Sequence, residues 1–78
     1  SIMSSQKNSY KGDIVFLVRV YNEASVLAST LQGIFDAGYT NIVIVDDGST
    51  DDSLQIAQDF AKKHSHIIVL HHSQNRGG

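Results

Sequence analysis

Two adjacent carboxylates, Asp46 and Asp47, are the residues of this sequence best placed to do chemistry. They follow an unbroken β-branched run, IVIV at 42–45, and precede Gly48. Such a run is typical of a strand covered on both faces, as in a parallel sheet flanked by helices. Ligands of these sheets bind beyond the carboxyl ends of the strands. The sequence therefore predicts that both acids lie at the rim of a ligand cleft.

Three strands and two helices would hold the acids at that rim. Apolar runs predict strands from 13 to about 19 or 20, at 42–46 and at 67–70, and helical spacing of apolar residues predicts helices at 24–37 and 52–63. The two consecutive βαβ units should be right-handed, with parallel strands in the order three, two, one. We therefore expect an α/β fold, a three-layer αβα half-Rossmann-like unit.

Composition limits the class of protein and its partners. Residues 1–11 are polar and without apolar period, which predicts a flexible leader before one small domain at 12–78. The absence of cysteine excludes a disulfide framework and fits a cytoplasmic location. A net charge of −2 gives no electrostatic reason to expect a nucleic acid partner. No apolar run approaches the roughly 20 residues of a membrane span.

Three motifs, each after an apolar strand, resemble those of the inverting family 2 glycosyltransferases, which have the GT-A fold. The motifs are VYNE at 20–23, VDDGSTD at 45–51 and NRGG at 75–78. The resemblance covers 13–78 and implies the N-terminal, nucleotide-binding part of a GT-A domain. It also implies an enzyme that transfers a sugar from a nucleotide-diphospho-sugar donor to an acceptor hydroxyl.

The resemblance assigns donor binding to particular residues. Tyr21 and Glu23 match positions near the base and ribose, and one of Asp46 and Asp47 matches an aspartate that accepts a hydrogen bond from the nucleobase. We favour Asp47 for the base, with Asp46 in a structural role, and the choice between them stays open. Arg76 would lie near the diphosphate. The full predicted set is Val20, Tyr21, Glu23, Asp46, Asp47, Ser49 and Arg76.

Two departures from the family pattern qualify the prediction. Arg19 stands where the family usually has proline, which leaves open a contact of Arg19 with the donor or its phosphate. The family's Asp-x-Asp motif, which binds the divalent metal (Mg or Mn), and its catalytic base would follow Gly78. We therefore interpret the 78 residues as an inactive piece of a longer enzyme, which could itself associate with a membrane.

Structural explanations stay open for the same side chains. The acidic run could be only a turn and a helix cap, Tyr21 could pack over the sheet end, and Asn22 could cap a helix. The four histidines are interpreted as surface residues and not as a metal site.

A receiver-like regulatory module is the alternative from another class of protein. Its acidic pair would follow the first strand and its phosphoacceptor aspartate the third. Here the acidic pair follows the second strand instead.

The strand order leaves 14–18 at an edge of the sheet. No proline or charge protects this edge, so it can pair with another strand. We predict a two-fold homodimer in which this strand pairs antiparallel with its copy.

Overall fold

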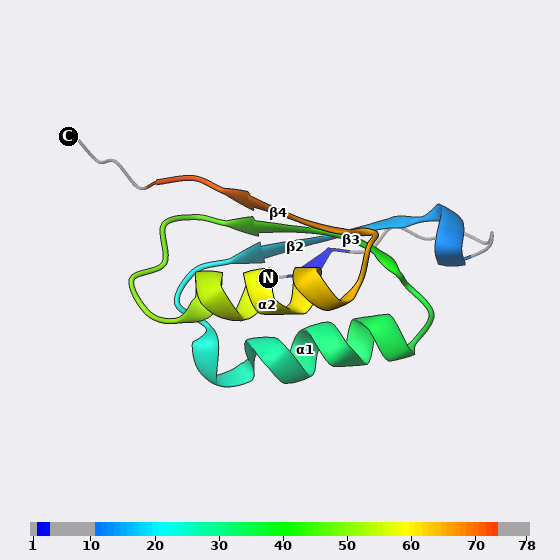
Figure 1. Cartoon of the computed structure of the whole chain (residues 1–78), viewed down its shortest axis with the longest axis horizontal. Helices are drawn as coiled ribbons and strands as arrows, with labels where there is room; N and C mark the ends of the chain where they lie inside the picture. The colour runs from blue at the N-terminus through cyan, green and yellow to red at the C-terminus, as the bar shows by residue number, and fades with distance from the viewer. Residues whose placement is uncertain (1, 4–10, 74–78) are drawn as a thin grey trace.

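The computed structural model describes residues 2–3 and 11–73. The elements in chain order are β1 (Ile2–Met3), the 3₁₀ helix η1 (Lys11–Asp13), β2 (Val15–Val20), α1 (Ala24–Asp36), β3 (Asn41–Asp46), α2 (Ser53–Lys63) and β4 (Ile67–His71) (Figure 1). The sheet order is β1-β2-β3-β4, with β2, β3 and β4 parallel and β1 antiparallel to β2. The predicted α/β class and the order of the parallel strands are confirmed.

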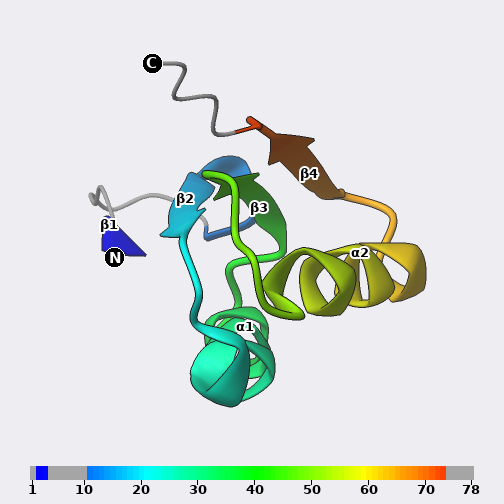
Figure 2. The ribbon, with the colours of Figure 1, turned by 90° about the vertical axis from the view of Figure 1, so that its left-hand side faces the viewer.

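Both helices lie on the same face of the sheet (Figure 2). Burial accordingly alternates along β2, where Phe16 and Val18 are buried but Val15 is 58% exposed. Two right-handed crossovers that step in one direction along a sheet place their helices on one side. The predicted covering of the strands on both faces is therefore not found in the described part of the chain, which forms two layers. A third layer would require helices that these residues do not contain.

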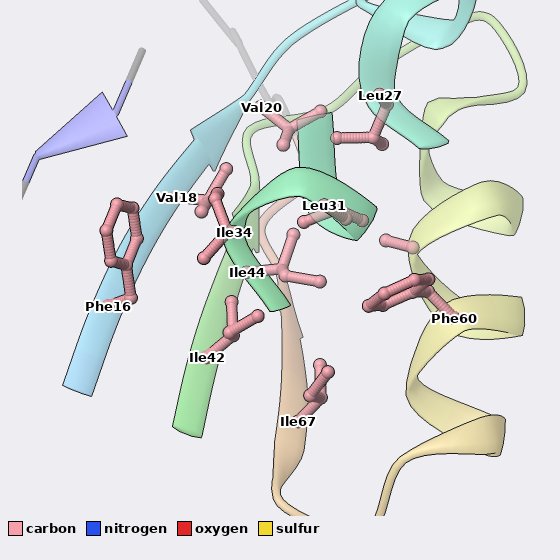
Figure 3. Close-up of a cluster of buried hydrophobic side chains, with 11 residues drawn as sticks. Phe16, Val18, Val20, Leu27, Leu31, Ile34, Ile42, Ile44, Phe60 and Ile67 are labelled. Carbon is pink, nitrogen blue, oxygen red and sulfur yellow. The ribbon is translucent and has the colours of Figure 1, made fainter. Parts of the chain in front are cut away.

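The core fills the space between the sheet and the two helices (Figure 3). Leu27, Leu31 and Ile34 recur at helical spacing along α1 and are buried against the sheet, where Ile42 and Ile44 of β3 are fully buried. Full burial of one such side chain contributes about 1.5–3 kcal/mol. The core therefore fixes β3, which delivers the acids, at the centre of the parallel strands.

Gly38 ends α1, as its position after the last apolar residue predicts. Its φ of 104° lies in the left-handed region that favours glycine. The Tyr39 N–H donates to the Ile34 carbonyl and the Gly38 N–H to the Phe35 carbonyl. These bonds satisfy carbonyls that the helix end would leave without partners.

The amino-terminal end adds a feature that the sequence did not predict. Ile2 pairs with Val18 and Met3 with Leu17, so β1 lies along the edge of β2. Lys11 donates from Nζ to the Ala37 carbonyl at 2.9 Å and therefore contacts the end of α1. Residues 1 and 4–10 of the predicted leader lie outside the described residues.

Candidate functional site

The connections that leave β2 and β3 meet the end of β4 at one edge of the sheet, beside the N-termini of both helices (Figure 1). The Asp47 N–H donates to the Val20 carbonyl at 2.9 Å, and the His72 N–H donates to the Asp46 carbonyl at 2.8 Å. These bonds continue the parallel pairing just past the strand ends. The described polar connections thus share the rim that the sequence predicts for a ligand cleft.

Asp46 is fully buried at the end of β3. Its Oδ2 accepts hydrogen bonds from the N–H groups of Gly48 and Ser49, each at 3.2 Å, and its Oδ1 accepts one from the Ser49 hydroxyl at 2.6 Å. His71 Nδ1 lies 3.2 Å from Oδ2.

The charge of Asp46 is stabilised by these contacts. Burial acts to raise the pKa of Asp46, but the hydrogen bonds from Ser49, His71 and Gly48 outweigh burial, and the pKa lies below the usual carboxyl value. Gly48 adopts a φ of 87°, which allows the chain to fold back over the carboxylate. Asp46 is therefore a buried acid around which the loop after β3 is built.

Asn22 ties the loop after β2 to the loop after β3. Its N–H donates to Ser49 Oγ at 2.9 Å, and its side-chain oxygen accepts from the N–H groups of Thr50 and Asp51 at 2.7 and 3.3 Å. Asn22 has a φ of 51°, a conformation that asparagine tolerates better than most residues. Its side chain thus does not cap α1, one of the roles left open by the sequence, but joins the two loops.

The amino ends of the helices are capped across the two loops. The residues just before α1 and α2, Glu23 and Asp52, make no side-chain cap bond. Asp51 instead accepts from the Ala24 N–H at 3.1 Å with Oδ2 and from the Ser53 N–H at 2.9 Å with Oδ1. One carboxylate therefore satisfies the first N–H of both helices, where the helix dipoles also favour negative charge.

Ser53 completes this arrangement and was missed in the sequence. Its hydroxyl oxygen accepts from the Glu23 N–H at 2.8 Å, and the residue is fully buried. Hydrogen bonds from the Ser53 hydroxyl, and then from its N–H and that of Ala24, hold the pKa of Asp51 below the usual carboxyl value despite an opposing effect of burial. A serine at the second position of the helix predicted at 52–63 was the available signal, but its partner is 30 residues away.

A polar pocket of about 270 Å³ opens beside these linked loops. It is lined by Arg19, Val20, Tyr21, Glu23 and Asp47. Arg19 Nη2 donates to Asp47 Oδ2 at 3.0 Å, and the two side chains are 60% and 32% exposed. The pocket thus presents a guanidinium and two carboxylates to solvent.

The seven predicted site residues separate into three groups. Val20, Tyr21, Glu23 and Asp47 line the pocket, whereas Asp46 and Ser49 form the hydrogen-bonded loop and do not line it. Arg76 lies outside the described residues. Arg19, which departs from the family pattern and for which the sequence left a contact with the donor open, lines the pocket as well.

A hollow over α2 and β4 offers less chemistry than this pocket. It has a volume of about 390 Å³ and is lined by Gln55, Gln58, Ala61, Lys62 and Val69, which include no carboxylate, hydroxyl or thiol. Over residues 2–3 and 11–73, no three His, Cys, Asp or Glu side chains gather as a metal site. Within the same ranges, no helix is long and apolar enough to cross a membrane.

Comparison with known proteins shows the family. Residues 15–78 match the family model described as glycosyl transferase family 2, and the chain belongs to that family. The resemblance seen in the sequence motifs is thereby confirmed.

Three relatives illustrate the range of matches. The chain is 40% identical over 75 residues, 95% of its length, to an uncharacterized protein of Methanocaldococcus jannaschii, and this segment is 29% of the relative. It is 37% identical to the glycosyltransferase GlyG of Streptococcus pneumoniae, over 83% of the chain and 22% of the relative. Identity to the poly-beta-1,6-N-acetyl-D-glucosamine synthase of Staphylococcus epidermidis is 34%, over 87% of the chain and 17% of that protein.

The chain therefore spans less than a third of each of these relatives. No solved structure matched it significantly.

Proposed function

We propose that the pocket beside Arg19 and Asp47 binds the nucleoside part of a nucleotide-sugar donor. The enzyme to which these residues belong would transfer the sugar to an acceptor hydroxyl with inversion. One observation carries the proposal: four motif residues, Val20 at the end of β2 and three from the connections after β2 and β3, line a single pocket at the carboxyl ends of parallel strands, where α/β sheets bind ligands. Membership of the glycosyltransferase family supports the same reaction class.

Asp47 is the proposed acceptor for the nucleobase. An ionised carboxylate only accepts hydrogen bonds, so it suits an imide or amino N–H of a base. Both oxygens of Asp46 already accept bonds from Ser49 or Gly48, and Asp46 is fully buried. The neighbouring Asp47 lines the pocket and is partly exposed, which favours Asp47 over Asp46 for contact with the ligand.

Tyr21 and Glu23 are proposed to complete the nucleoside site. Tyr21 is half exposed in the pocket, so its ring offers an apolar surface to a base or ribose. Glu23 is partly buried at the start of α1 and offers a carboxylate to ribose hydroxyls. The bonds that Asn22 and Asp51 make between the loops hold this pocket in shape before a ligand arrives, which reduces the entropy lost on binding.

The remaining parts of the predicted reaction are proposals about the complete protein. We propose that a divalent metal, Mg or Mn, and a catalytic base act there with residues other than those described, and that residues 12–78 form the N-terminal part of a GT-A domain. The cytoplasmic location rests on the absence of cysteine. The receiver-like alternative has no supporting observation, because Asp46 and Asp47 lie at the carboxyl end of β3, the second parallel strand in the chain.

A homodimer through β2 is also a proposal. Ile2–Met3 occupies part of that edge by pairing with Leu17 and Val18, so a second copy would have to displace β1. The β2 strand itself is mostly apolar and contains no proline, which supports strand pairing as the mode of association.

Nitrogen-15 NMR titration would test the nucleoside site. The nucleoside diphosphates of the five common bases are added one at a time to the labelled chain. We expect saturable shifts of the Tyr21, Glu23 and Asp47 amides with at least one base, and no shift at Lys63 at the far end of α2. If no nucleotide shifts the pocket amides, the proposed function is wrong.

A further inference from the structure

The charges around the pocket do not by themselves suit a nucleotide. Glu23 and Asp47 line it, and Asp51 and Asp52 lie in the connection that follows. A nucleoside diphosphate is a polyanion, so these carboxylates repel the part of the ligand that carries the phosphates. Arg19 is the one cation among the residues that line this pocket in the described part of the chain.

Arg19 is placed to offset that repulsion. It lies near the carboxyl end of β2, and the alternation of burial places its side chain on the open face of the sheet, away from the helices. Its side chain is 60% exposed although Nη2 donates to Asp47 Oδ2 at 3.0 Å. A guanidinium carries five N–H donors in a planar fork, so it can contact a carboxylate and a phosphate together.

We propose that Arg19 is the phosphate contact of this pocket and binds the diphosphate of the ligand whose nucleobase lies against Asp47, the carboxylate that Arg19 also contacts. The inference rests on the proposed function, because it names the group that would make an acidic pocket accept a nucleotide. It also gives the ligand a direction. The base lies against Asp47 and Tyr21, and the phosphates leave the pocket on the open face of the sheet.

A purely orienting role for Arg19 makes a different prediction. If Arg19 only positioned Asp47, its loss would weaken a nucleoside and its diphosphate by the same factor, since both present the same base to Asp47. Loss of a phosphate contact weakens the binding of the diphosphate alone, because the nucleoside carries no phosphate. The attraction between exposed charges is also screened by salt, so a phosphate contact predicts that the extra loss of diphosphate affinity on removal of Arg19 shrinks as the ionic strength rises, whereas a purely orienting role predicts no extra loss at either ionic strength.

The test compares the wild-type chain with Arg19→Gln and Arg19→Lys, and uses Lys62→Gln as the matched control. Lys62 is exposed on α2 and does not line this pocket, so its replacement removes one positive charge elsewhere. Each variant is titrated with the nucleoside and the nucleoside diphosphate of the base that wild type binds best, at low and high salt. Thermal melting checks that each variant is folded.

We expect Arg19→Gln to weaken the diphosphate by about tenfold or more, as for a hydrogen bond to a charged group, and the nucleoside by less than about twofold. Arg19→Lys should keep part of the diphosphate affinity, and Lys62→Gln should match wild type. Equal losses for both ligands, or no loss for either, would overturn the phosphate contact. If wild type binds the nucleoside but gains nothing from the diphosphate, the nucleoside site stands and this inference fails. If it binds neither ligand, the proposed function fails as well.

Discussion

The Ser49 hydroxyl lies 2.6 Å from Oδ1 of the buried Asp46 carboxylate. The same hydroxyl oxygen accepts a hydrogen bond from the Asn22 N–H at 2.9 Å. One side chain thus links the acid at the end of β3 to the loop that follows β2. The motif serine and its aspartate hold the rim together, and Asp47 beside them is left to line the pocket.

Replacing Ser49 by alanine should destabilise the fold. The change removes a donor to the buried Asp46 carboxylate and the acceptor of the Asn22 N–H, and we expect it to lower the free energy of unfolding by about 1–3 kcal/mol. Urea denaturation would measure this. Ser29→Ala is the matched control, because Ser29 is exposed on α1 and donates only to the Val26 carbonyl of its own helix. Equal effects of the two changes would contradict the linking role of Ser49.

Asp51→Ala should destabilise the protein more than Asp52→Ala. Asp51 accepts from the first N–H of α1 and of α2, whereas Asp52 makes no side-chain cap bond although it directly precedes α2. Loss of the Asp51 carboxylate leaves two helix ends without these partners. The melting temperatures of the two variants, measured side by side at neutral pH, would show the difference. If Asp52→Ala lowered the melting temperature as much, the shared cap would not be the stabilising contact.

Stability should fall in acid because of Asp46. The folded pKa of Asp46 lies below the unfolded value, so its contribution is fully present above about pH 4, the unfolded carboxyl value, and is lost as the pH falls from there through the folded pKa. Asp51 acts in the same direction. Urea denaturation between pH 7 and acid pH would measure the decrease in the free energy of unfolding. In Asp46→Asn this free energy should depend less steeply on pH. A carbon-13 NMR titration of the Asp46 carboxyl group tests the same point in wild type, where a normal pKa would contradict it.

Asp47→Ala should weaken nucleotide binding and leave the fold intact. When an N–H donor of the nucleobase loses its carboxylate acceptor in the pocket, the free energy of binding becomes less favourable by about 1–3 kcal/mol. Calorimetry with the nucleoside diphosphate that binds best would measure the loss. Asp59→Ala serves as the control, because Asp59 is exposed on α2 and accepts from Gln55 away from the pocket. Unchanged affinity in folded Asp47→Ala would move the base contact to another residue.

The chain should form a stronger dimer through β2 when β1 no longer pairs with the outer edge of that strand. Deleting residues 1–3 removes the partner of Leu17 and Val18, so we expect a stronger dimer in sedimentation over a concentration series.

A proline in β2 would identify the edge that pairs in such a dimer. The Val20 carbonyl points toward β3, where it accepts from Asp47, and strand alternation then directs the Val15 N–H to the opposite edge. Val15→Pro should therefore block the dimer without removing a bond to β3. A deletion variant that stays monomeric at high micromolar concentration would reject this interface.

The sequence by itself determined the local features of this protein. The apolar runs and helical spacing predicted every parallel strand and both α-helices to within two residues, and Gly38 predicted the end of α1. The position of Asp46 and Asp47 at a strand end followed from the same pattern. These features depend on neighbours only a few residues apart, which a period in the sequence records.

Only the tertiary structure decided which residue does what at the rim. It buried Asp46 and left Asp47 in the pocket beside Arg19, and it gave Asn22 and Ser53 partners on the opposite loop. The physical reason is that these contacts join residues about 30 positions apart. They form when the core brings the strand ends together, and no spacing in the sequence encodes them.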